Sequence, residues 1–212
     1  MGMSVADPSG LSFAAPAGVG QTNEFSPARL LVCLLAFGAS LTVGSFAAKA
    51  QDAAPQDFQV KAAYLVNFPK YVVWPSTAFA GTNSPITVAI FGDDNVAAEF
   101  RRMIQGGRTV DGHPFVLKRV TKEAEIGDDC HILFIARSEH QQVPAILEKI
   151  KGSAILTVGE GDDFLELGGI VRLVHRDRKI RLHVNLSATG QSRLKISSRL
   201  LVVADAVQGK AK

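Results

Sequence analysis

Four short runs, three of them almost wholly apolar and one interrupted by Lys118-Arg119, constrain the fold of this chain more than any other feature. Each run is bounded by turn residues and is therefore predicted to be a buried strand. The runs are Ile86–Phe91, Phe115–Val120, Cys130–Ala136 and Ala154–Val158. Segments with helical spacing, Val96–Met103 and Val143–Lys151, follow the first and third runs. Apolar strands separated by helices are typical of a mostly parallel sheet that helices cover on both faces.

The end of the chain has a different pattern. Ile170–Val174 and Lys179–Asn185 flank a polar turn, which predicts an antiparallel hairpin. A final helix is predicted over Ile196–Val207, with a buried stripe of Leu200, Val203, Ala204 and Val207. The predicted fold class is therefore α/β: a single-domain sandwich with a mostly parallel mixed sheet, helices on both faces and a C-terminal antiparallel hairpin.

Local signals refine two of the predicted helices. Asp94 or Asn95 is expected to cap the helix over Val96–Met103. An earlier helix should begin near Phe58, and Pro69 should end or kink it because proline lacks a backbone donor. This helix belongs to the segment Val60–Pro75, in which Asn67, Lys70 and Trp74 interrupt an apolar pattern. Those three residues fit either internal packing or a partner surface.

The first 50 residues have the pattern of an export signal. Arg29 precedes an apolar stretch from Leu30 to Ala48, and Ala48-Lys49-Ala50 matches a signal-peptidase site. We predict cleavage after Ala50, with Ser45-Phe46-Ala47 as a poorer alternative site and an uncleaved membrane anchor as the other interpretation. Residues 51–56 would then be a flexible lead-in, and residues 57–208 would form one domain.

Composition excludes some classes of function. The net charge of +3 is unchanged by cleavage, because the leader carries two basic and two acidic residues. This mild charge argues against a nucleic-acid partner. Only Cys130 of the two cysteines remains after cleavage, so no intramolecular disulfide is possible in the mature chain.

The sequence contains no strong catalytic motif. It lacks the nucleophile elbow, the phosphate-binding loop, the dinucleotide fingerprint and the zinc-protease helix motif. We therefore predict no catalytic residues, cofactor or metal site; a hydrolase with an unrecognised site is a remote alternative. Cys130 and His131 are neighbours on a predicted strand and point to opposite faces, so they cannot pair. We interpret Cys130 as a buried structural thiol, with redox sensing or an intermolecular disulfide as the alternative.

Two charged constellations remain. Glu160, Asp162, Asp163 and Glu166 crowd a glycine-flanked loop. Metal binding is conceivable there, but Asp162 or Asp163 capping a short helix that ends at Gly168-Gly169 is the favoured interpretation.

The terminal hairpin concentrates positive charge. It carries Arg172, Arg176, Arg178, Lys179, Arg181 and His183. The hairpin is either a solvated face or a docking surface for an acidic partner or a small anion. The candidate partner or ligand surface is Glu160, Arg172, Arg181, His183 and Asn185.

Five blocks of sequence, taken together and in order, resemble the YfiR-like family of bacterial periplasmic regulatory proteins. The blocks are Val60–Ala63 with Asn67-Phe68 and Trp74-Pro75; Cys130–Ile135; Leu156–Glu160 with Phe164 and Gly168–Ile170; Lys179–Asn185; and Leu194–Leu201. Two departures stand out. Pro69 occupies a position where the family usually has a small residue, and Cys130 lacks the partner cysteines through which some relatives form disulfides.

The resemblance implies an α/β sandwich, export to the periplasm and frequent dimerisation. The best-known member binds and represses the periplasmic part of an inner-membrane diguanylate cyclase, and an outer-membrane lipoprotein can sequester it. We therefore expect a non-enzymatic periplasmic regulator of an inner-membrane signalling protein in a cyclic-di-GMP pathway. The alternative is a periplasmic sensor of a small ligand, either an anion or an amino acid.

Overall fold

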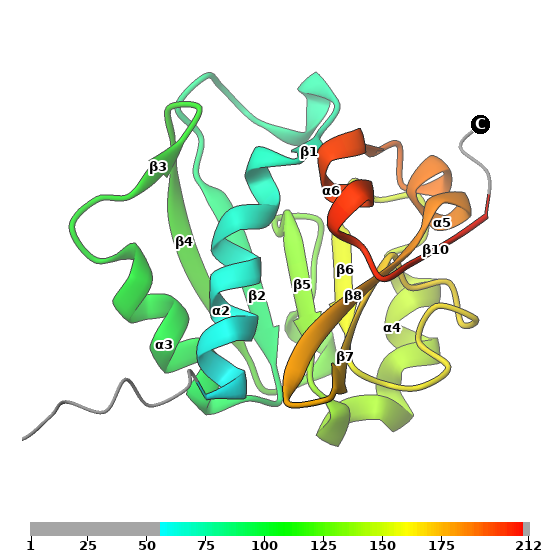
Figure 1. The fold of residues 1–212 in the computed structure, drawn as a ribbon. Helices are drawn as coiled ribbons and strands as arrows, with labels where there is room; N and C mark the ends of the chain where they lie inside the picture. Colours follow the sequence, from blue (N-terminus) through cyan, green and yellow to red (C-terminus); the bar gives the residue numbers. More distant parts are fainter. Residues whose placement is uncertain (1–55, 210–212) are drawn as a thin grey trace, which may run out of the picture. The chain divides into compact units, whose positions relative to one another are not determined.

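The computed structural model describes residues 56–209 and contains an eight-stranded mixed sheet (Figure 1). The strands lie in the order β10-β8-β7-β6-β5-β2-β4-β3. They are β2 (Ile86–Phe91), β3 (Thr109–Val110), β4 (His113–Val120), β5 (Ile132–Ile135), β6 (Leu156–Gly159), β7 (Val171–Arg176), β8 (Lys179–Asn185) and β10 (Ala206–Gln208). A separate antiparallel pair consists of β1 (Val72–Val73) and β9 (Lys195–Ile196).

The sheet is mostly parallel, as predicted. Neighbouring strands from β4 through β2, β5 and β6 to β7 all pair in parallel. β7 and β8 form the predicted antiparallel hairpin. Its two turn residues, Asp177 and Arg178, have φ values of 52° and 59°. Positive φ at both central positions matches the twist of tight hairpins, so the turn suits the strands it joins.

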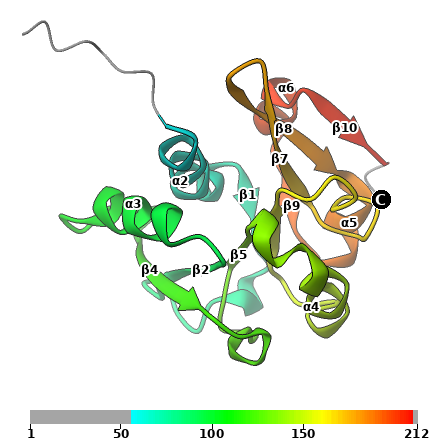
Figure 2. The same ribbon diagram turned by 90° about the horizontal axis from the view of Figure 1, so that it is seen from below.

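Helices cover both faces of the sheet, which confirms the predicted fold class (Figures 1 and 2). They are α2 (Asp57–Asn67), α3 (Asp94–Ile104), α4 (Val143–Lys149), α5 (Leu186–Gln191) and α6 (Ser198–Val203). Short 3₁₀ turns are η1 (Phe68–Lys70), η2 (Ser76–Ala78), η3 (Glu123–Glu125) and η4 (Arg137–Gln142).

Alternation along the strands divides the buried residues into two clusters. Val88 and Ile90 of β2 belong to the cluster beneath α2, α3 and α6. Ala89 and Phe91 of the same strand belong to the cluster beneath α4. Because successive strand residues point to opposite faces, one apolar run supplies both layers of the core. This is why β2, β5 and β6 show no polar alternation in the sequence.

The helix that opens the described region ends where the proline requires it. α2 stops at Asn67, and Pro69 lies buried in the 3₁₀ turn that follows. The chain then continues into β1. The prediction that Pro69 ends this helix is confirmed.

Among residues 56–209, no helix has the length and apolar character that crossing a membrane requires. The predicted leader, residues 1–50, its two alternative cleavage sites and the anchor interpretation lie outside the described residues. The same holds for residues 51–55 of the predicted lead-in.

The cap predicted for α3 is one residue too late. Asp93, not Asp94 or Asn95, occupies the N-cap, and its Oδ1 accepts hydrogen bonds from the backbone N–H groups of Asn95 and Val96, both at 3.0 Å. Asp94 instead begins the helix, where a carboxylate interacts favourably with the helix dipole.

The final helix predicted over Ile196–Val207 is wrong. Ile196 pairs with Val72 in the small sheet, and Ser197 caps α6, which begins at Ser198 and is only six residues long. The chain then forms β10 alongside β8. Of the predicted buried stripe, Leu200 is buried, whereas the exposed fractions of Val203 and Val207 are 67% and 44%. Long-range pairing and β-branched residues favour the extended ends.

The short helix predicted after Asp162 or Asp163 is also wrong. Residues 162–168 form successive turns, which the Phe164 ring anchors. Phe164 is fully buried against Gly159 and Gly169, where added Cβ atoms would lie 2.4 and 2.2 Å from the ring. The backbone N–H of Gly169 donates to the carbonyl of Phe164 at 2.9 Å. Closing the loop around this ring takes the place of helix formation.

Candidate functional site

Glu160 lies at the carboxyl end of β6, where it joins that strand to α2. Its Oε1 is 2.5 Å from Nζ of Lys61, and the two side chains are only 12% and 15% exposed. The backbone N–H of Arg137 donates to Oε2 at 3.1 Å. Because a largely buried carboxylate needs such partners, Glu160 positions α2 on the sheet and has little surface to offer a ligand.

The hairpin brings together three of the predicted site residues. Arg172 and His183 are directly opposite each other across β7 and β8. Arg172 pairs with Asp162 of the glycine-flanked loop. Asp205 pairs with Arg181 at 3.5 Å and with His183 at 3.8 Å. We call Asp162, Arg172, Arg181, His183 and Asp205 the charged ribbon.

The charged ribbon carries less net charge than the sequence indicates. Its two arginines face two aspartates, so their formal charges balance. Uncompensated positive charge lies instead at the exposed hairpin tip, where Arg176, Arg178 and Lys179 flank Asp177. A docking role for the charged ribbon stays a prediction, and the two aspartates that balance its arginines lie outside the hairpin in sequence.

Asn185 has a structural environment. It is 9% exposed, its amide donates to the carbonyl of Leu165 at 2.9 Å, and its Oδ1 accepts from the backbone N–H of Ala188 at 3.2 Å. Asn185 thereby caps α5 and holds the glycine-flanked loop. An Asn directly before a helix is an ordinary capping signal, which could have predicted both α5 and this role.

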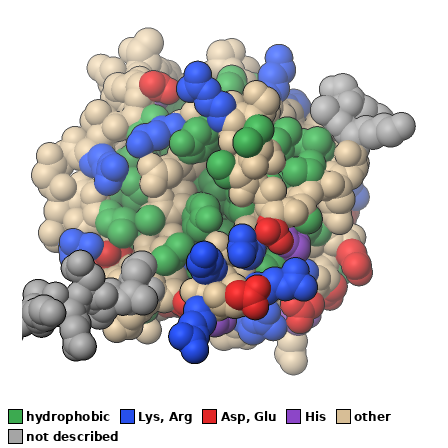
Figure 3. All heavy atoms as spheres, viewed as in Figure 1, with side chains coloured by type: hydrophobic (Ala, Val, Ile, Leu, Met, Phe, Trp, Pro, Cys, Tyr) green, Lys and Arg blue, Asp and Glu red, His purple; other side chains and the backbone are tan. Residues whose placement is uncertain are grey.

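An open apolar groove, which the sequence did not predict, lies between α2 and α6. It encloses about 620 Å³ and is lined by Val60, Ala63, Tyr64, Asn67, Phe68, Tyr71, Arg199, Leu200 and Val203. We call this hollow the α2–α6 groove. Figure 3 shows apolar side chains gathered across this face, with Lys and Arg side chains around them.

The walls of the α2–α6 groove are held in place by local contacts. The Tyr64 ring stacks on Phe68 with centroids 5.8 Å apart, and its hydroxyl donates to the carbonyl of Ile180 at 3.4 Å. Asn67 donates to the carbonyl of Ala63 and accepts from Lys70, which leaves its amide occupied. The groove is therefore a preformed apolar surface with cationic side chains, Arg199 and Lys70, near it.

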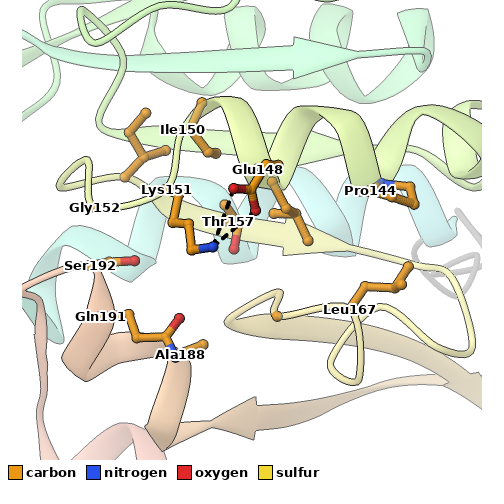
Figure 4. A pocket seen from close by; sticks show the side chains of 13 residues that line it. Pro144, Glu148, Ile150, Lys151, Gly152, Thr157, Leu167, Ala188, Gln191 and Ser192 are labelled. Carbon is orange, nitrogen blue, oxygen red and sulfur yellow. Dashed lines mark hydrogen bonds and ion pairs between the residues drawn. The ribbon is translucent and has the colours of Figure 1, made fainter.

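A second hollow lies between α4, the glycine-flanked loop and α5 (Figure 4). It encloses about 400 Å³, and Gln191 and Ser192 lie across it from Lys151. Nζ of Lys151 is 3.1 and 3.2 Å from the two carboxylate oxygens of Glu148. Because these charges satisfy each other and both side chains are well exposed, they offer little attraction to a ligand.

Cys130 is a buried thiol, as predicted. It is 3% exposed, and burial, helped by the nearby Asp129 charge, raises its pKa to about 12. The thiolate is the reactive form of cysteine, so this environment disfavours redox sensing. His131 does not pair with the thiol; its ring nitrogens bond to Thr87 and Ala78. Residues 56–209 contain no group of three metal-ligating side chains.

Comparison with solved structures finds distant similarity. A conserved domain protein from Vibrio cholerae has 10% identity and a TM-score of 0.48, with 74% of this chain and 62% of that chain covered. The ABC domain in complex with L-Trp from Streptococcus pneumoniae has 10% identity and a TM-score of 0.47, with 71% and 60% covered. The chain thus spans less than two thirds of either protein.

Comparison by sequence is more informative. No curated protein matches the chain. A family model described as YfiR/HmsC-like matches residues 58–205, which include every described helix apart from the first residue of α2, and all but the last strand. The chain belongs to the YfiR/HmsC-like family.

Proposed function

We propose that this chain is a non-enzymatic periplasmic regulator that binds and represses the periplasmic part of an inner-membrane signalling enzyme, such as a diguanylate cyclase. Membership of the YfiR/HmsC-like family supports this proposal. So do the predicted export signal and the lack of a recognised catalytic motif in the sequence. A homodimer and an outer-membrane lipoprotein that sequesters the regulator are further proposed partners.

The observation that carries the proposal is the α2–α6 groove. Its preformed apolar walls suit an apolar helix, because docking such a helix removes the surfaces of both partners from water. Arg199 at the groove and Lys70 near it are exposed and cationic. The occupant we propose is therefore an amphipathic helix of the membrane partner, with acidic residues beside its apolar stripe.

α6 offers a matched pair of positions for a test. Val203 lines the groove and Val202 does not, yet both are exposed, at 67% and 84%. Aspartate at either position should leave the fold intact, since exposed substitutions usually change stability by less than about 0.5 kcal/mol. Only aspartate at position 203 places a charge in the groove.

The experiment measures cyclic-di-GMP in the native bacterium. Deleting the gene should raise the cellular level of cyclic-di-GMP. Expression of either the natural chain or the Val202→Asp variant should return it to the original level. Val203→Asp should fail to restore it although the protein accumulates normally. An unchanged level on deletion would exclude repression of a cyclase; equal rescue by both variants would exclude the groove.

A further inference from the structure

Residues 76–85 lie against the amino-terminal ends of β2, β4 and β5, where a stack of aromatic rings holds them. Phe79 lies between His113 and His131, with ring centroids 4.4 and 4.6 Å away and interplanar angles of 27° and 19°. Two rings this close cannot share one face of Phe79, so the histidines occupy opposite faces. Trp74 meets Phe79 and His131 edge-on, at 6.4 and 6.3 Å. We call these four residues the aromatic clasp.

The hydrogen bonds of His131 require a neutral ring. Its Nδ1 accepts from the backbone N–H of Thr87 at 3.1 Å, and its Nε2 lies 3.0 Å from the carbonyl of Ala78. An N–H donor can only meet an unprotonated Nδ1, and a carbonyl can only meet a protonated Nε2. The two contacts therefore fix one neutral tautomer, and a second proton would have to displace Thr87.

His113 is held in a way that tolerates a proton. Its Nδ1 lies 2.6 Å from the carbonyl of Ser84, so this nitrogen is the donor. Neutral and protonated imidazole both supply that donor. His131 is thus the member of the clasp that loses a contact on protonation, the one between Nδ1 and Thr87, while its Nε2 still donates to Ala78.

The surroundings of His131 also favour its neutral form. The side chain is 8% exposed, and burial is the largest cause that lowers its pKa from the ordinary 6.5, with His113 a further contribution. The contact to Ala78 and the charge of Asp129 act in the opposite direction. Asp128, Cys130, Lys151 and Arg193 line the hollow beside the His131 ring.

We propose that the aromatic clasp is an acid-sensitive latch: protonation of His131 at Nδ1 turns its contact with the Thr87 N–H into a clash of two donors. The ring is displaced, which breaks the stack on Phe79 and releases residues 76–85 from the amino-terminal ends of β2, β4 and β5. The proton comes from solvent, and no covalent bond changes. Opening exposes Trp74 and Phe79, which line an apolar hollow of about 180 Å³ with Pro69 and Ile86. This latch is a property of the fold and does not depend on the proposed partner.

The sign of the pH dependence follows from linkage. The open form, with an ordinary histidine pKa, takes up the proton before the closed form does. The clasp is therefore fully stable above pH 6.5 and loses stability as the pH falls from there through the lowered pKa of the closed state. Because one proton is involved, the equilibrium constant for opening should increase by up to about tenfold for each unit by which the pH falls in this window.

Trp74 is the single tryptophan of the chain, so its fluorescence reports the clasp directly. Purified protein without residues 1–50 is titrated from pH 8 to pH 4.5 while far-ultraviolet circular dichroism is followed in parallel. The emission maximum should move reversibly to longer wavelength below pH 6.5 while the dichroism stays constant. His131→Gln, which keeps an acceptor and a donor but does not titrate, should abolish the transition. His113→Gln should retain it.

A second measurement needs no variant and tests whether the clasp opens in acid even if the His131→Gln variant does not fold. Hydrogen exchange of the Thr87 amide, corrected for its intrinsic pH dependence, should accelerate in the same pH window in the natural sequence. A flat fluorescence titration, a transition retained in His131→Gln, a simultaneous loss of dichroism, or unchanged Thr87 protection would each overturn the latch.

Discussion

Lys61 and Glu160 illustrate how a single contact positions the proposed docking surface. α2 forms one wall of the α2–α6 groove, and Lys61 on that helix pairs with Glu160 at the end of β6. Both side chains are largely withdrawn from water. Removing Lys61 leaves the largely buried Glu160 carboxyl without its ion-pair partner and with only the Arg137 N–H as donor, which costs more than the pair itself contributes.

Lys61→Met should therefore destabilise the fold by about 3 kcal/mol. Lys70→Met is the matched control, because Lys70 is exposed and its side chain bonds only to Asn67 among residues 56–209. That variant should stay within about 0.5 kcal/mol of the natural sequence. Urea denaturation of both variants measures the difference; equal free energies of unfolding would show that the Lys61–Glu160 pair does not anchor α2.

The glycine-flanked loop shows what decides structure at the level of an element. Sequence preference alone favours a capped helix after Asp162, but the Phe164 ring needs the space beside Gly159 and Gly169. Local propensity is a weak prior that a well-packed aromatic ring overrides. The loop in turn receives the amide of Asn185 and supplies Asp162 to Arg172. Its shape therefore affects the charged ribbon.

Two glycine-to-alanine changes should have opposite effects on stability. Gly169→Ala places a Cβ 2.2 Å from the Phe164 ring, and overpacking of this kind costs about 1–3 kcal/mol. Gly190→Ala lies inside α5 with no atom within 4 Å of the added Cβ, and it should stabilise by about 0.5–1 kcal/mol. Thermal denaturation gives both values. A stable Gly169→Ala variant would contradict the packing argument.

The strands could be predicted from sequence because burial on both faces leaves a local mark, a run of apolar residues. The C-terminal elements could not, because Ile196 is extended only through pairing with Val72, more than a hundred residues away. The candidate site divides in the same way. The positions of Arg172, Arg181 and His183 on one hairpin were predictable. The position of Asp205 and the α2–α6 groove were not, because both depend on how the chain after Ile196 divides into α6 and β10.

At the scale of the whole molecule, the topology also bears on function. The chain proceeds from β2 to β4 on one side and from β5 to β6 on the other, so β2 and β5 mark the point where ligands usually bind in such sheets. Here Ser138 and Glu139 pack closely against Gly92 at the end of β2. These contacts favour a docking surface elsewhere, and sensing of a small ligand stays a prediction.

Site-specific photocrosslinking in the native bacterium tests the central claim most directly. A photoreactive residue at position 203, in the α2–α6 groove, is compared with one at position 122, which is exposed and directly precedes the 3₁₀ turn η3. We expect a crosslink from position 203 to an inner-membrane protein with a periplasmic segment, and none from position 122. No membrane protein captured at position 203, or equal capture at both positions, would contradict it.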